Sequence, residues 1–277
     1  MQISLLQTKL YIPAHPTEFV ARPHLLEKLR KGLDRRLMLL AAPPGFGKTA
    51  LIQEWIRVAN PHVAWVSLDG GDNDPNRFWM YFIAALQRRQ ADLGENALEL
   101  LRAQSTGTLP GQAMLDSLIN DLAVLAEEWV MVLDDYHEIE TATIHESMVY
   151  LLEHLPPLFH LLLIARSDPP FPIARWRVGG QLAEIRADDL RFTASEAAAF
   201  LNQAMGLSLN EQDVAALEER TEGWIAGLQL AALSMQGHQN VHDFIEAFSG
   251  SNRYIVDYLT EEVFNRQSTE IQSFLLQ

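Results

Sequence analysis

"LMLLAAPPGFGKTALIQEW", residues 37–55, decides the fold, because it joins an apolar run to a helical pattern through a turn rich in proline and glycine. The run 37–42 predicts a buried strand, and the apolar spacing after the turn predicts an amphipathic helix. The turn ends in GFGKT, residues 45–49, close to the phosphate-binding consensus G-x-x-x-x-G-K-[ST]. Ala42 stands where the consensus has its first glycine.

Such a loop binds phosphate because successive backbone N–H groups, in the loop and at the start of the next helix, point at phosphate oxygens. Glycines let the main chain approach without a Cβ clash. Lys48 would reach the β- and γ-phosphates, and the Thr49 hydroxyl would bind Mg²⁺. Ala42 is the smallest departure and lies at the strand end, where phosphate contact needs glycine least. We therefore predict an ATP or ADP site rather than a turn without a ligand. The residues assigned to it are Pro44, Gly45, Phe46, Gly47, Lys48, Thr49 and Ala50.

A second part of the site is predicted in EEWVMVLDDYH, residues 127–137, where Asp134 and Asp135 follow an apolar strand. Ligands of an open α/β sheet bind outside the carboxyl ends of the strands. Asp134 can hold Mg²⁺ through water, and Asp135 is placed to orient or deprotonate the attacking water. Paired acids after a strand also cap helices or face solvent, so the assignment depends on the phosphate loop.

Arg166 ends a third apolar run, in LLLIARSDPP, residues 161–170. An arginine at the tip of a parallel strand would reach the same crevice and could sense the γ-phosphate. The alternative is a surface salt bridge at the end of the strand.

Alternating strand and helix patterns predict a parallel sheet with helices on both faces. The predicted strands are residues 37–42, 63–68, 130–133, 161–165 and 182–185. Asp74-Pro75 and Thr193-x-x-Glu196 are signals for the start of a helix. No strand pattern follows Thr193, so we predict an α/β domain to about residue 190 and a helical remainder.

Composition limits the partners of the chain. Its 277 residues carry 21 basic and 36 acidic side chains, a net charge of −15, and no lysine- or arginine-rich run. A DNA-backbone binder needs a cationic face, so we expect no DNA binding by these residues. Cysteine is absent, and neither a membrane-length apolar run nor a secretory signal occurs. We expect a cytoplasmic location and no membrane partner.

Further segments, together with the phosphate loop, resemble one family in order along nearly the whole chain. They are TKLYIP, VARPHLLEKL, APPGFGKT, WVSLDGGDNDPNRFWMYFIAAL, VLDDYH, LLLIARSDPP, LRFTASEAAAFL and TEGWIAGLQLAAL. The chain resembles the N-terminal part of the MalT-like, LuxR-type ATP-dependent transcriptional regulators, which belong to the STAND class of signalling ATPases. In that family alanine commonly replaces the first glycine of the P-loop, as Ala42 does here.

The resemblance implies the order 2-3-4-1-5 for the five-stranded sheet of a P-loop NTPase, with the Arg166 strand between the strands of the P-loop and Asp134. It implies an extended segment at 1–21, a helical subdomain at 191–249 and the start of a winged-helix domain at 250–277. Val20 and Arg22 would lie beside the nucleotide. Pro23 replaces an acidic residue common in related proteins, and Gly223-Trp224 matches only loosely a GxP-type motif, with no proline.

We interpret the chain as a nucleotide-dependent switch, in which slow hydrolysis resets the state and ATP with an unidentified inducer favours self-association. A P-loop kinase or phosphotransferase for a small metabolite is the alternative, although no acceptor-binding motif marks it. A binding-only scaffold is disfavoured by the presence of Lys48, Thr49, Asp134 and Asp135. Members of the family continue into a sensor domain and a DNA-binding helix-turn-helix. Since a helix pattern runs uncapped to the last residue, we expect this chain to be an excised module.

Overall fold

The computed structural model of the chain describes residues 4–103, 111–235, 245 and 253–264. Contacts between residues divide them into two compact units. The first holds residues 4–15, 22–42, 49–103 and 111–186, and the second holds 16–21, 43–48 and those described from 187 onward. The phosphate loop, residues 43–48, therefore belongs by its contacts to the second unit, although the strand before it belongs to the first.

A five-stranded parallel sheet forms the centre of the first unit. Its strands are β1 (Leu37–Ala41), β2 (His62–Ser67), β3 (Trp129–Asp134), β4 (Phe159–Ala165) and β5 (Leu182–Arg186). They lie in the order β2-β3-β4-β1-β5, and every pair is parallel. This confirms the predicted α/β fold and strand order, with β4 between β1 and β3.

The strands of this unit are joined by helices and short 3₁₀ turns. The α-helices are α1 (Pro23–Gly32), α2 (Lys48–Ala59), α3 (Pro75–Gln87), α4 (Glu95–Ala103), α5 (Gln112–Ala123), α6 (Ala142–Glu153) and α7 (Ile173–Val178). The 3₁₀ turns are η1 (Gln7–Leu10), η2 (Gly70–Asn73) and η3 (Tyr136–Glu138). The first residue of α2, Lys48, is the last residue of the phosphate loop.

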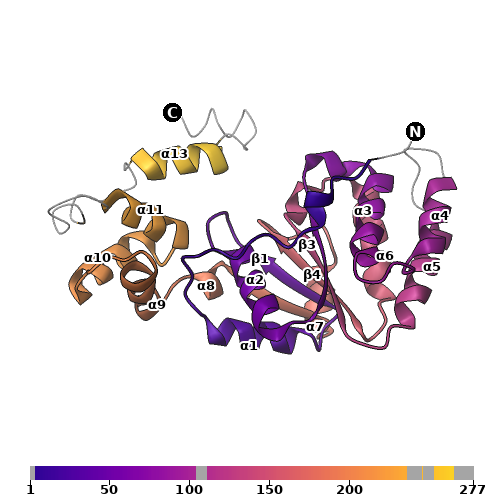
Figure 1. Cartoon of the computed structure of the whole chain (residues 1–277), viewed down its shortest axis with the longest axis horizontal. Coiled ribbons are helices and arrows are strands. Elements are labelled where there is room, and N and C mark those ends of the chain that lie inside the picture. The colour runs from indigo at the N-terminus through magenta and orange to yellow at the C-terminus, as the bar shows by residue number, and fades with distance from the viewer. Residues whose placement is uncertain (1–3, 104–110, 236–244, 246–252, 265–277) are drawn as a thin grey trace. The chain divides into compact units, whose positions relative to one another are not determined.

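Side chains of the sheet alternate between two buried faces, as expected of a parallel sheet covered by helices. On one face Leu39, Met131 and Leu163 join a single apolar cluster with residues of α3, α4, α5 and α6, and Figure 1 shows these four helices together on one side of β3 and β4. On the other face Met38 meets α1, where a Cβ on Gly32 would lie 2.6 Å from the Met38 sulfur.

Two predicted helix starts are present. The Asp74 side chain accepts a hydrogen bond from the Arg77 N–H, and Pro75 occupies the first turn of α3. Thr193 and Glu196 form a reciprocal capping box at the start of α9 (Ala194–Ala199). Both starts could be predicted because the signal lies within four residues of the chain.

The second unit is helical where it is described. Its elements are α8 (Ala187–Leu190), α9, a π-helical turn η4 (Phe200–Ala204), α10 (Glu211–Thr221), α11 (Ile225–Met235) and α13 (Arg253–Glu262). Phe200, Leu217 and Leu228 lie in its apolar core, and Val20 packs against that core. None of the helices described in the chain is long and apolar enough to cross a membrane. Of residues 250–277, expected to begin a winged-helix domain, only 253–264 lie within the described residues.

Candidate nucleotide-binding site

The two loop glycines, Gly45 and Gly47, have conformations that other residues rarely adopt. Gly45 has φ +80° and Gly47 has φ +70°, both in the left-handed region that a Cβ disfavours. A Cβ on Gly45 would also lie 2.6 Å from the Ala226 Cβ and 2.7 Å from the Trp224 Nε1. Glycine is therefore required at position 45 by both the backbone and the space around it.

Ala42 occupies a different environment, which explains why it can replace the first consensus glycine. Its φ is not positive, and it is 2% exposed. Its N–H donates to the Ala165 carbonyl at 3.3 Å, which prolongs the pairing of β1 with β4 by one bond. A methyl group at this strand end is accommodated in the core, and no glycine conformation is needed.

Lys48 lies at the junction of the loop and α2 and is 9% exposed. Its Nζ donates to the Pro43 carbonyl at 3.0 Å, so the side chain folds back along its own loop. The ammonium group is thus held against a backbone carbonyl of the loop itself, and a phosphate-binding loop requires such a cation.

Thr49 and Asp134 meet within the first unit. The Thr49 hydroxyl donates to the Asp134 carboxylate, at 3.3 Å from each carboxylate oxygen. Asp134 is 5% exposed and also accepts the Asp135 N–H at 3.0 Å. A hydroxyl beside a carboxylate of fixed orientation is the donor set with which P-loop ATPases hold Mg²⁺. These two residues fit that ion.

Asp135 points out of the strand end at which Asp134 is buried. Its backbone is left-handed, with φ +56°, and its side chain is 54% exposed. The next residue, Tyr136, is buried and shares a 3.0 Å hydrogen bond with His145 Nδ1 of α6. Burial raises the pKa of Tyr136 and lowers the pKa of His145, so both are neutral near pH 7. This buried neutral pair anchors the turn that presents Asp135, and no local pattern in the sequence indicated it.

The remaining predicted residues take different positions. Arg166 directly follows β4 and is half-buried at the carboxyl edge of the sheet, the same edge at which β3 ends in Asp134. Arg22 is 4% exposed at the start of α1, where its carbonyl accepts the Leu25 and Leu26 N–H groups. Val20 belongs to the second unit, which also holds the phosphate loop.

Trp224 and Ala226 contact the phosphate loop directly. The Trp224 indole N–H donates to the Pro44 carbonyl at 3.1 Å, and the Ala226 N–H donates to the Gly45 carbonyl at 3.0 Å. Beside them Pro43, Phe46 and Leu259 help to line an apolar pocket of about 170 Å³. The resemblance at Gly223-Trp224 lacks the proline of the related motif, so it predicts no contact for the Trp224 side chain. The structure instead places its indole against the loop.

Comparison with known proteins identifies the family. A family model described as "AAA ATPase domain" matches residues 18–164, just over half of the chain, including the phosphate loop and the Asp134 strand. The chain belongs to the AAA ATPase domain family. Together with the loop geometry, this confirms the predicted P-loop ATPase fold.

Longer proteins contain related segments. The chain is 34% identical, over 96% of its length, to 24% of the serine/threonine-protein kinase PknK of Mycobacterium tuberculosis. It is 33% identical, over 98% of its length, to 30% of the HTH-type transcriptional regulator MalT of Vibrio cholerae. The predicted resemblance to MalT-like regulators is thus confirmed. The chain spans less than a third of the length of each of these curated relatives.

Solved structures agree on the fold. A STAND protein with a tetratricopeptide repeat sensor from Pyrococcus horikoshii superposes with a TM-score of 0.58 at 17% identity, over 95% of this chain and 34% of that one. Cdc6p from Pyrobaculum aerophilum gives 0.50 at 15% identity, over 86% and 68% of the two chains. At such low sequence identities, the structural similarity shows the fold of this chain and not its activity.

Proposed function

We propose that the chain is an ATP- and ADP-binding switch module of a larger regulator. The backbone N–H groups of residues 45–49 and the Lys48 ammonium would bind the phosphates, with Val20 and Arg22 beside the nucleotide. Thr49 would hold Mg²⁺ directly and Asp134 through water, and the ion would neutralise charge on the phosphates. Asp135 would orient the attacking water, and Arg166 would sense the γ-phosphate.

The observation that carries the switch is the contact of helical residues with the phosphate loop itself. Two successive loop carbonyls, of Pro44 and Gly45, accept hydrogen bonds from Trp224 and from the start of α11. Gly45 leaves no space for a side chain between the loop and these residues. A nucleotide that moves the loop backbone must therefore change the contacts of the helical subdomain. We assign that subdomain to residues 191–249, with a winged-helix domain beginning after it.

The relatives support a regulatory role for this chain rather than the activities for which those relatives are named. The same module, over 96% or more of this chain, matches about a quarter of a protein kinase and less than a third of a transcriptional regulator. Those proteins carry names for different activities. A segment shared by both is better suited to control an output than to perform it.

In this scheme ADP holds the helical subdomain in its resting contact with the loop, and ATP with an inducer favours a self-associating form. Nucleotide and inducer can shift the two states only as far as their affinities for those states differ. Hydrolysis returns the module to rest, so a slow rate suits the task. A kinase for a small metabolite would need a pocket for its acceptor beside the loop. The small apolar pocket there is lined by Phe46 and Leu259 among others, and the Trp224 indole N–H is the one polar side-chain group among its lining residues. That N–H already donates to the Pro44 carbonyl, so no polar side chain of the lining remains to bind an acceptor.

Replacement of Trp224 tests the coupling. Trp224→Phe keeps an aromatic ring but removes the N–H that the Pro44 carbonyl accepts. A hydrogen bond of this kind contributes about 1 kcal/mol, so we expect the affinity for ADP to fall about fivefold while the affinity for ATP changes less. Isothermal titration calorimetry with ADP and with ATP measures the ratio of the two affinities.

Trp55→Phe is the matched control. Its indole N–H has no hydrogen-bond partner within the described residues, so the same truncation removes no bond from the loop. If Trp224→Phe leaves the ratio of ADP to ATP affinity at the value of the parent and of Trp55→Phe, the proposed coupling is wrong.

A further inference from the structure

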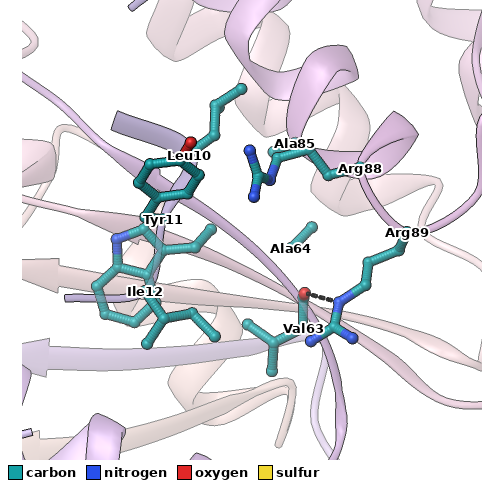
Figure 2. Close-up of a pocket in the computed structure, with 9 residues that line it drawn as sticks. Leu10, Tyr11, Ile12, Val63, Ala64, Ala85, Arg88 and Arg89 are labelled. Atoms are coloured by element: carbon teal, nitrogen blue, oxygen red, sulfur yellow. Dashed lines mark hydrogen bonds between the residues drawn. The ribbon is translucent and has the colours of Figure 1, made fainter. Parts of the chain in front are cut away.

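A second pocket lies in the first unit at the β2 edge of the sheet. None of the residues of the predicted phosphate site lines it. It has a volume of about 380 Å³, within the range of sites for small molecules. Its lining comes from residues 10–12 of the N-terminal segment, from residues 63–65 of the edge strand β2, and from Ala85, Arg88 and Arg89 at the end of α3. Figure 2 shows Tyr11 and Ile12 on one side of the pocket and the two arginines on the other.

Arg88 and Arg89 are the charged residues among those that line this pocket. In a chain of net charge −15, Arg57, Arg77 and Arg177 each hold a carboxylate. Neither Arg88 nor Arg89 has a carboxylate partner among the residues that the structure describes. An anionic ligand would supply the missing charge, and a guanidinium can offer it two parallel donors.

Both guanidinium groups are held in place without using most of their donors. The Arg88 guanidinium lies over the Tyr11 ring, 4.4 Å from its centroid, a cation–π contact that holds it beside the ring. Arg89 Nε donates to the Val63 carbonyl of the strand edge at 3.1 Å, as the dashed line in Figure 2 marks. Arg89 therefore keeps its terminal N–H groups for a ligand.

The wall opposite the arginines is fixed as well. The buried Lys9 forms ion pairs with Asp72 and, at 2.8 Å, with Asp69. Slightly earlier in the segment, the Leu6 N–H donates to the Tyr81 hydroxyl at 3.0 Å. These contacts tie the N-terminal segment to η2 and α3, so Tyr11 is presented to the pocket by a braced backbone. A site arranged before its ligand arrives loses less free energy on binding.

We propose that this pocket binds a small organic oxyanion, a carboxylate or phosphate ester with a compact apolar or aromatic body. Arg88 and Arg89 bind the oxyanion, while Ile12, Ala64 and the Tyr11 ring contact the body. The site uses none of the residues assigned to ATP, ADP or Mg²⁺. The oxyanion proposal therefore does not depend on the proposed switch.

Ligand-observed NMR and calorimetry with defined probes test the site. The probes are benzoate, indole-3-acetate and phenyl phosphate, each paired with its neutral amide or alcohol counterpart. We expect the parent chain to bind at least one oxyanion, about tenfold or more tightly than the neutral counterpart. The Arg88→Gln/Arg89→Gln double variant should lose at least that factor and still show the parent's melting shift with ADP. Carboxylate and phosphate arms separate the two sources of the oxyanion.

Arg102→Gln is the matched control, because Arg102 is an exposed arginine of α4 that does not line this pocket. It should bind the probes as the parent does, and so should Lys48→Ala. The proposal is overturned if oxyanions and neutral counterparts bind alike, or if the double variant keeps its affinity. Failure of every probe at millimolar concentration, or binding only of an extended acidic peptide, also overturns it.

Discussion

Lys48→Ala should leave the melting temperature of the chain unchanged when ADP or ATP is added with Mg²⁺, whereas the parent chain should be stabilised. A ligand at 100 times its dissociation constant adds about 2.7 kcal/mol to the free energy of unfolding, or roughly 5–10 °C in a chain of this size. The substitution removes the ammonium group that lies 3.0 Å from the Pro43 carbonyl, within the loop itself. Differential scanning fluorimetry over a nucleotide titration measures the effect.

Lys31→Ala controls for the loss of a lysine. Lys31 is exposed near the end of α1, 3.6 Å from Glu27, and its removal should leave the nucleotide-dependent shift intact. A Lys48→Ala protein that melts at the parent temperature without nucleotide, and is stabilised like the parent with it, would contradict the assignment of the loop.

Asp135→Asn should separate binding from hydrolysis. Asp134 keeps its contact with the Thr49 hydroxyl, so Mg²⁺ and ATP should bind with parent affinity. Loss of a positioned proton acceptor typically slows a reaction by about 10²–10⁴-fold, and we expect phosphate release to fall at least about tenfold. With γ-labelled ATP and a metabolite extract, the parent should yield free phosphate and no labelled small molecule.

Asp188→Asn is the control for this substitution, since the Asp188 side chain is 96% exposed on α8. Turnover by Asp135→Asn at the rate of Asp188→Asn would show that Asp135 does not act on the water. A labelled metabolite that depends on Lys48 would instead favour the phosphotransferase alternative over the switch.

The parts of the fold that could be predicted from the sequence are those with local signals. Continuous apolar runs mark strands buried on both faces, and the cap at Asp74 and the box at Thr193 lie within a few residues of the helices they start. The register of neighbouring strands is not local, and the order 2-3-4-1-5 came from resemblance to a family. Ala42 illustrates the division, because its strand-end position is held by a backbone hydrogen bond to Ala165, far along the chain.

The contacts that complete the candidate site could not be predicted, because they join residues distant in sequence. The Trp224 indole reaches Pro44 across 180 positions, and a single tryptophan in a helical region is typical of packing. The Tyr136–His145 pair is closer, yet nothing in its spacing distinguishes it from two core residues. The oxyanion pocket depends on three separate segments. No alternation of charge or hydropathy places Arg88 over Tyr11.

The nucleotide content of the purified parent chain is the most direct test of the nucleotide site. Denaturing the protein and separating the released small molecules by ion-pair chromatography identifies what the loop held. We predict ADP, stoichiometric with the chain, or tight binding of added ADP with Mg²⁺ by calorimetry where the nucleotide is lost during purification. Release of no adenine nucleotide, together with no binding of added ADP or ATP, would contradict the assignment of residues 44–50, Asp134 and Asp135 to a nucleotide site.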